Sequence, residues 1–212
     1  MKVKKGVRSR QWIVEQSVHV FNTFGIDITL NQLSDHLEIS RGRISHFFAT
    51  RDALFVAISE AYQANLNQIR NDFLMEKPQY NLSDIEIFFS RIMDNQYHYR
   101  CATLYTAGAG NSKNELNIHI IESYRNHKAY IRRLAENFVK CQSLKEEILH
   151  DSNYSIFEFQ FVNLFTSWVI SKEIYYSDQP YSEVKPLFLK GLFRLFDPYL
   201  VKECDCPFKN PE

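Results

Sequence analysis

The stretch TLNQLSDHLEISRGRISHFFATRDAL, from Thr29 to Leu54, decides the fold of this 212-residue chain. Thr29 is a preferred N-cap residue, and Gln32 follows three positions later, which predicts a capping box. Three leucines then recur at three- and four-residue steps, the spacing of one apolar stripe on a helix: Leu30, Leu33 and Leu37. The stretch therefore begins with a short helix that has a defined start and one buried face.

A second short helix is expected after the break at Glu38 and Ile39. Ser40 is a suitable N-cap, and Ile44 and Phe48, four residues apart, are expected to face inward. Thr50 then caps a third helix, with the acidic Asp52 in its first turn, where a negative charge suits the helix dipole. Two short helices joined by a tight turn form a helix-turn-helix motif.

The outward face of the second helix carries polar side chains that suit nucleic acid. With Ile44 and Phe48 pointing inward, the side chains left outside are Arg41, Arg43, Ser45 and His46. These groups donate hydrogen bonds to phosphates and to the acceptor edges of bases in a major groove. The alternative is a solvated basic face, which Arg41 and Arg43 alone would favour. The capped two-helix frame around them favours DNA binding.

The segment from about Arg10 to Leu54 resembles the DNA-binding domain of TetR-type transcriptional regulators. The positions that carry the resemblance are, in chain order, Ile13, Ser17, Phe21, Gly25, Thr29, Leu33, Ser34, Ile39, Ser40, Gly42, Ile44, Phe48, Arg51, Asp52 and Leu54. Both the order and the spacings agree with the family pattern. Three positions depart from it. Glu38 stands where the family usually has a turn glycine, Ser45 where it has a phosphate-contacting tyrosine, and Arg51 where it has a lysine.

The presence of Glu38 in place of the family's turn glycine has a structural consequence. A glutamate in this turn must either adopt a left-handed backbone at some cost or use a different turn. The arginine at position 51 keeps the positive charge and adds a planar fork of donors.

The resemblance implies an all-α fold in which a three-helix DNA-binding head, residues 1–52, precedes a helical effector-binding and dimerisation body, residues 53–212. It implies a homodimer that binds double-stranded DNA at a palindromic operator and acts as a ligand-responsive repressor. The residues expected at the DNA are Thr29, Ser40, Arg41, Gly42, Arg43, Ser45, His46, Phe47 and Arg51. We expect no resident cofactor, only a small-molecule effector of unknown identity.

Composition and charge agree with this division. The six glycines and six prolines are few, which favours helices over a turn-rich sheet protein. Net charge is zero, but residues 1–55 hold eight Lys/Arg against five Asp/Glu, so the first part carries +3 and the remainder −3. A basic end on an acidic body is typical of a DNA-binding head on a body that does not bind DNA.

The sequence favours a cytoplasmic protein. The basic N-terminus has no apolar run behind it, and the most apolar segment, Ile156–Ile170, is too short and too polar to span a bilayer. The four cysteines show no disulfide framework, which indicates reduced thiols.

Caps and apolar stripes predict the further helices. Their expected ranges are Val7–Phe24, Arg51–Phe73, Ser83–Thr106, Ser112–Gln142, Ser155–Tyr176 and a last helix that starts near Ser182 or Lys185 and runs to Phe196. In the last of these, Pro186 is tolerable only in the first turn.

The last two long helices are apolar over much of their circumference, so they must be buried on most sides. A monomer's own core is one explanation, and a four-helix interface with a second copy is the other. TetR-like proteins dimerise through their last two major helices, and a helix-turn-helix unit usually needs two copies to read a palindrome. The residues expected at the interface are Phe161, Phe165, Trp168, Phe188, Leu192 and Phe196.

An effector site is expected in the body, because TetR-like bodies resemble small cups lined by helices. The candidate lining residues are Phe89, Met93, Gln96, Tyr97, His119, Tyr124 and Trp168, and each is also an ordinary core or surface residue in the alternative interpretation.

The sequence shows no phosphate-binding loop, zinc-protease motif or nucleophile elbow, so we expect neither an enzyme nor catalytic residues. Cys204 and Cys206 form the one suspicious pair, since two close thiols can hold a soft metal or form a redox pair. Two alternatives thus stay open: a metal- or thiol-responsive regulator that uses this pair, and an all-helical small-molecule-binding protein with no role at DNA.

Overall fold

The computed structural model describes residues 5–77, 80–108 and 115–201, and within them all side chains except those of residues 5–8 and 115–124. These residues form an all-helical fold that contains no β-strand. The predicted fold class is therefore confirmed. The chain divides into two compact units: unit 1 takes in the described residues of Met1–Asn67 and Asn95–Ile120, and unit 2 those of Gln68–Asp94 and Ile121–Glu212. The expected division at residue 52, between a DNA-binding head and an effector-binding and dimerisation body, stays a prediction.

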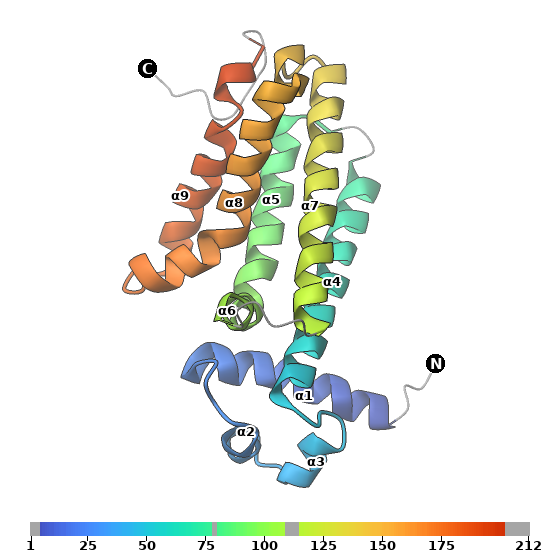
Figure 1. The fold of residues 1–212 in the computed structure, drawn as a ribbon, viewed down its shortest axis with the longest axis vertical. Helices are drawn as coiled ribbons and strands as arrows, with labels where there is room; N and C mark the ends of the chain where they lie inside the picture. The colour runs from blue at the N-terminus through green and yellow to red at the C-terminus, as the bar shows by residue number, and fades with distance from the viewer. Residues whose placement is uncertain (1–4, 78–79, 109–114, 202–212) are drawn as a thin grey trace. The chain divides into compact units, whose positions relative to one another are not determined.

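Unit 1 contains the helix-turn-helix motif. Its helices are α1 (Lys5–Phe24), α2 (Leu30–His36), α3 (Arg41–Ser45), the first part of α4 (Arg51–Glu76), the end of α5 (Leu82–His98) and α6 (Arg100–Gly108), as Figure 1 shows. The predicted inward stripes form one core, in which Ile13, Leu33, Ile44 and Leu54 are completely buried. Burying these apolar side chains is the main force that holds the short helices α2 and α3 in place, since neither is long enough to be stable alone.

The turn between α2 and α3 uses a left-handed residue, as the replacement of the family's glycine predicts. Glu38 has φ 53°. The backbone N–H of Ile39 donates to the carbonyl of Ser34 at 3.1 Å, and that of Glu38 donates to Asp35 at 3.2 Å, so the end of α2 is satisfied by a glycine-type cap.

The single helix expected over Ser83–Thr106 is wrong, because Tyr99 interrupts it and separates α5 from α6. The cause is the side chain of Asn22 on α1. Its amide donates to the His98 carbonyl at 2.7 Å and accepts from the Cys101 N–H at 3.0 Å. One side chain thus takes the places of two main-chain partners at the break, and Arg100 fixes it further by donating to the Asn22 carbonyl at 3.1 Å.

Unit 2 is a bundle of antiparallel helices around an aromatic core. It contains most of α5, α7 (Glu115–Lys140), α8 (Asp151–Tyr175) and α9 (Tyr181–Arg194), which run side by side in Figure 1, with 3₁₀ turns at Glu146–Leu149 and Asp197–Tyr199. Phe89 of α5 lies at its centre, with ring centroids 5.4 Å from Phe161, 5.0 Å from Phe165 and 6.0 Å from Phe193. Edge-to-face pairs of this kind stabilise a core beyond the burial of their area.

Three helix starts in unit 2 differ from expectation. Helix α8 begins at Asp151, four residues before the expected Ser155. Asn81, not Ser83, caps α5, since its side chain accepts from the Asp84 N–H at 3.0 Å while Asp84 accepts from the Asn81 N–H at 3.1 Å. Helix α9 begins at Tyr181, so Pro186 lies beyond its first turn, one turn later than expected. The carbonyl that Pro186 leaves without a donor belongs to Ser182, which is exposed, so water can bond to it. In the described part of the chain, no helix combines the length and the apolar character needed to cross a membrane.

Candidate nucleic-acid interface

The start of the helix-turn-helix motif is fixed by the predicted capping box. The Thr29 side chain accepts from the backbone N–H of Gln32 at 3.3 Å, and the Gln32 side chain accepts from the backbone N–H of Thr29 at 2.9 Å. Ser40 caps α3 by accepting from the backbone N–H of Arg43 at 3.2 Å. Both helices of the motif therefore begin at the residues that the sequence indicates.

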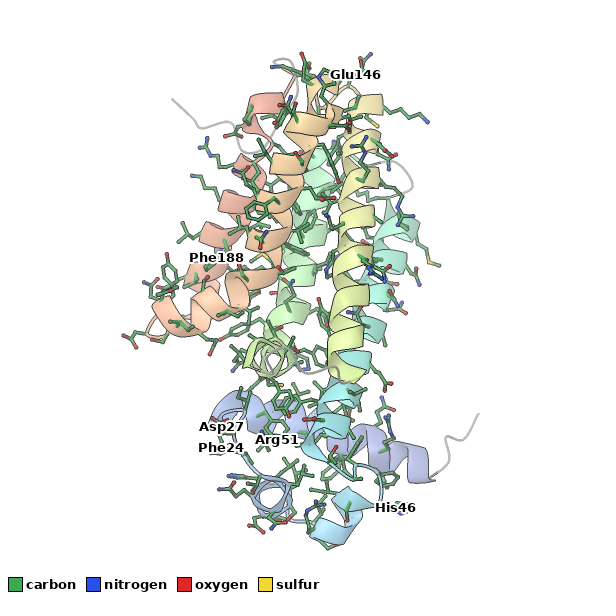
Figure 2. The ribbon with its side chains drawn as sticks, in the orientation of Figure 1. Phe24, Asp27, His46, Arg51, Glu146 and Phe188 are labelled. Carbon is green, nitrogen blue, oxygen red and sulfur yellow. The ribbon has the colours of Figure 1, made fainter. Side chains whose placement is uncertain are left out.

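Helix α3 presents the expected polar face outward. Ile44 is 0% exposed and Phe48 1%, so they anchor the helix, while Gly42, Arg43, Ser45 and His46 are exposed. Figure 2 shows His46 at the end of α3. Gly42 has no atom within 4 Å of the position that a Cβ would take, so the backbone here is open to an approaching molecule. The structure thus brings Arg43, Ser45 and His46 together on one accessible face, whereas Arg41 is half-buried.

The two arginines of α3 differ in their surroundings. Arg43 points its guanidinium along α1, where Nη2 lies 3.5 Å from the Ser9 hydroxyl, a marginal hydrogen bond. Arg41 is half-buried, and its Nη1 is shielded from solvent without a hydrogen-bond partner. Ser45 donates to the carbonyls of Arg41 at 3.1 Å and Gly42 at 3.2 Å, which leaves its oxygen as an acceptor on the outer face.

Arg51 has an intramolecular role that the sequence does not indicate. Its guanidinium carbon lies 5.2 Å from the centroid of the Tyr105 ring, and Nη1 lies 3.4 Å from the carbonyl of Ile26. The Tyr105 ring also stacks on the ring of Phe55, with the two ring centroids 3.7 Å apart. The Tyr105 hydroxyl donates a short hydrogen bond to Asp52. The pKa of Tyr105 is raised, mainly by burial and then by its hydrogen bond to Asp52. Contact of Arg51 with DNA stays a prediction.

Phe47, the remaining residue expected at the DNA, is half-buried between aromatic neighbours, 4.7 Å from His46 and 6.4 Å from Phe48 between ring centroids. Arg10, which the sequence does not single out, lies over the Phe48 ring at 5.2 Å and pairs with Glu60 at 3.4 Å. Together with Ser9 beside Arg43, it shows that α1 borders the α3 face. No periodicity of the α1 sequence could have predicted these contacts, because they depend on how α1 crosses α3.

The candidate effector residues are divided between the two units. Phe89, Met93 and Trp168 are each 1% exposed and belong to unit 2, whereas Gln96 and Tyr97 belong to unit 1. The side chains of His119 and Tyr124 lie outside the described residues. Their assignment to an effector site stays a prediction.

Most of the residues expected at the dimer interface are buried within the single chain, and their assignment to an interface stays a prediction. Phe161, Phe165, Trp168, Leu192 and Phe196 are 0–5% exposed within the single chain, because they fill its own aromatic core. Phe188, labelled in Figure 2, is half-buried, and its ring lies 5.8 Å from that of Trp168. The apolar side chains that α8 and α9 leave outside are Ile156, Phe159, Ile174, Tyr175 and Leu187, which are 54–77% exposed.

Cys204 and Cys206 lie outside the described residues, so the thiol alternative receives no structural account. Within residues 5–77, 80–108 and 115–201, there is no group of three or more His, Cys, Asp or Glu side chains that could hold a metal ion. Cys101 and Cys141 are free thiols, and burial raises the pKa of Cys101 to about 12, which makes it a poor nucleophile.

Comparison with known proteins reveals no matching family model and no curated protein of similar sequence. Solved structures do match along almost the whole chain. A TetR-family transcriptional regulator from Marinobacter aquaeolei VT8 is 20% identical, with a TM-score of 0.78 over 95% of this chain and 93% of that chain. A TetR-family regulator from Cytophaga hutchinsonii is 16% identical, with a TM-score of 0.67 over 96% of this chain and 100% of that chain.

SmeT, solved in complex with triclosan, is 13% identical, with a TM-score of 0.64 over 97% of this chain and 98% of that chain. The fold is therefore that of a helix-turn-helix transcriptional regulator with a helical body. More particularly, it is the TetR-family fold, as the resemblance between residues 10 and 54 predicts.

Proposed function

We propose that this protein is a sequence-specific DNA-binding transcriptional regulator. The observation that carries the proposal is the capped and anchored helix α3, which presents Arg43, Ser45 and His46 on one exposed face. A short helix with polar, outward side chains on a rigid two-helix frame has the dimensions to enter a major groove. The TetR-family fold supports the same conclusion, since its solved members are transcriptional regulators.

The side chains of the motif divide by their expected targets. Arg43, Ser45 and His46 are placed to address base edges, with Arg43 the residue best suited to a guanine. Thr29 and Ser40, at the helix starts, are placed to hold the DNA backbone, as is Arg51 if it leaves its contact with Tyr105. Phosphate contacts set affinity and its salt dependence, while base contacts set sequence choice.

The regulator acts as a homodimer in this proposal. Helices α8 and α9 pack along each other and leave Ile156, Phe159 and Leu187 exposed, which is unfavourable in water for an isolated subunit. A second copy that covers the same face would form a two-fold interface and present two α3 helices to a palindrome.

The body binds a small-molecule effector, and the protein is a repressor that the effector releases. SmeT, of similar fold, was solved with triclosan, which supports a small-molecule site in a body of this kind. Release requires that the effector bind the DNA-competent and DNA-incompetent states unequally, so that it shifts the population between them.

Selection from a pool of random duplexes tests the function without knowledge of the operator. The purified full chain is mixed with the pool, bound duplexes are recovered and amplified, and the recovered sequences are compared with the starting pool. Enrichment of a two-fold symmetric sequence supports the proposal. A recovered pool that remains random contradicts the proposed function. The remaining candidate is then the all-helical small-molecule-binding protein with no role at DNA.

A further inference from the structure

Arg70 lies in the part of α4 that belongs to unit 2, and its side chain is half-buried with an unsatisfied nitrogen. Its guanidinium carbon lies 5.1 Å from the ring centroid of Tyr130 on α7, and its Nε is shielded from solvent without a hydrogen-bond partner. Among the described residues it forms neither a hydrogen bond nor an ion pair. A half-buried guanidinium without an anionic partner is unfavourable unless something else supplies the anion.

The buried Lys172 lies 3.9 Å from Glu173, and six other described cations of the same unit have carboxylate partners at 2.6–3.0 Å. The pairs are Lys77 with Asp84, Arg91 with Glu76, Lys128 with Glu158, Arg132 with Glu136, Lys185 with Asp94, and Arg194 with Asp197. These pairs are partly exposed, where an unpaired cation would be tolerated well. Arg70, which is half-buried and would gain more from a partner, has no such partner among the described side chains.

The described groups that interact with Arg70 carry no negative charge. His127 of α7 is neutral, because burial and then the positive charge of Arg70 lower its pKa to about 4. Tyr130 is neutral as well, since burial raises the pKa of its hydroxyl. Arg133, the other cation that influences Tyr130, is exposed. The local surplus is therefore the single charge of Arg70, set among neutral polar groups.

Aromatic side chains complete the surroundings. The ring of Tyr130 lies 6.0 Å from Phe88 of α5, and that of His127 lies 6.3 Å from Phe165 of α8. The imidazole and phenol rings are half-buried, so each has surface left for an apolar group. A ligand that reached Arg70 would thus meet a cation at one end and ring faces beside it.

We propose that Arg70 receives the carboxylate of a hydrophobic monocarboxylic acid, with the rings of His127 and Tyr130 against the apolar part of that ligand. This inference deepens the proposed function, because it gives the effector of the body a chemical class. A guanidinium matches a carboxylate with two parallel hydrogen bonds. One negative charge balances one positive charge, whereas a phosphate dianion would leave a second charge unpaired in a partly buried site.

Calorimetric titration of the full chain with 2-naphthoate and with decanoate tests the inference. The corresponding amides, 2-naphthamide and decanamide, serve as uncharged controls of nearly the same shape. At least one carboxylate should bind at least about tenfold more tightly than its amide, because charge-assisted hydrogen bonds are stronger than neutral ones. If neither acid binds, or if each acid binds no better than its amide, the inference is wrong.

Three variants locate the binding. Arg70→Met should abolish the preference for the carboxylate, and Arg70→Lys should keep the preference with weaker binding, because it retains the charge but not the fork. Arg91→Met, a matched loss of a partly exposed arginine in the same unit, should change neither. Preference that survives Arg70→Met places the acid elsewhere and overturns the assignment.

The melting temperature without ligand separates a binding role from a structural one. If Arg70 serves to bind a ligand, its unpaired charge destabilises the ligand-free protein. Arg70→Met should then leave the melting temperature unchanged or raise it. An arginine held only by its contact with Tyr130 should lower the midpoint when removed, which would contradict the proposal. None of these measurements involves DNA, so a failed duplex selection and a failed carboxylate site are distinguishable.

Discussion

The backbone N–H of Ile39 donates a 3.1 Å hydrogen bond to the carbonyl of Ser34, and this bond closes the turn in which Glu38 adopts φ 53°. The turn sets the angle between α2 and α3. A glutamate pays for this geometry through contact between its Cβ and its own backbone, and glycine has no Cβ.

Glu38→Gly should therefore stabilise the protein by about 1 kcal/mol, reduced somewhat by the greater freedom of glycine in the unfolded chain. Urea unfolding measures the change. Glu38→Ala is the control, since it removes the carboxylate but keeps the Cβ, and should bring no such gain. A Glu38→Gly protein that is less stable than Glu38→Ala would show that the left-handed backbone is not the constraint.

Tyr105 joins α6 to the start of α4 by stacking and by a hydrogen bond, and two substitutions separate these contributions. Tyr105→Phe keeps the stack on Phe55 and removes the bond to Asp52, so it should cost about 0.5–1.5 kcal/mol. Tyr105→Ala removes both and should cost about 2–3 kcal/mol. Equal losses of unfolding free energy in the two variants would mean that the stack contributes nothing.

His127 makes the protein sensitive to mild acid. Its folded-state pKa of about 4 lies below the ordinary value of 6.5, so the unfolded chain binds this proton first. The stability present above pH 6.5 is lost progressively as the pH falls from 6.5 toward 4. At pH 5 the loss relative to pH 7 should reach about 2 kcal/mol.

His127→Gln removes this titration, so its unfolding free energy should fall less between pH 7 and pH 5 than that of the wild type, by about 2 kcal/mol. Comparing slopes cancels the titration of all other groups. His46→Gln, which changes an exposed side chain, is the control. Parallel pH profiles for wild type and His127→Gln would refute the buried, neutral imidazole.

The dimer proposal depends on the outer face of α8 and α9. Size-exclusion chromatography with light scattering should give the wild type a mass twice the 25.1 kDa of one chain. Phe159→Asp places a charge on that face and should yield monomers. Met75→Asp changes a more exposed side chain, 80% against 67%, on α4, and should remain dimeric. A monomeric wild type, or a dimeric Phe159→Asp protein, contradicts the proposed interface.

The head could be predicted from sequence almost residue by residue because its determinants are local. Caps such as Thr29 and Ser40 act over three residues, and the inward positions Ile44 and Phe48 follow helical spacing. Contacts between distant segments carry no such signal. Neither the Asn22 side chain that separates α5 from α6 nor the stack of Arg51 on Tyr105 could be derived from any spacing.

In the body, the sequence does not show which apolar side chains are buried within their own chain. A helix that is apolar all round must be buried, but periodicity does not say whether its own chain or a second copy buries it. Phe161 and Leu192 lie inside their own subunit, while Phe159 and Leu187 remain outside. No sequence pattern distinguishes Arg70 either, since the lack of a partner among the described side chains depends on contacts between distant segments.

Titration of a selected duplex with wild type and with Arg43→Ala is the most direct test of whether α3 reads DNA sequence. Wild type should bind the selected duplex at least about 10³-fold more tightly than a scrambled one, with two subunits per duplex. Arg43→Ala should narrow that ratio by about 5- to 150-fold, the value of one good base contact, and Arg91→Ala should leave it unchanged. An Arg43→Ala protein that distinguishes the two duplexes as well as wild type does would contradict the proposal that α3 reads DNA sequence.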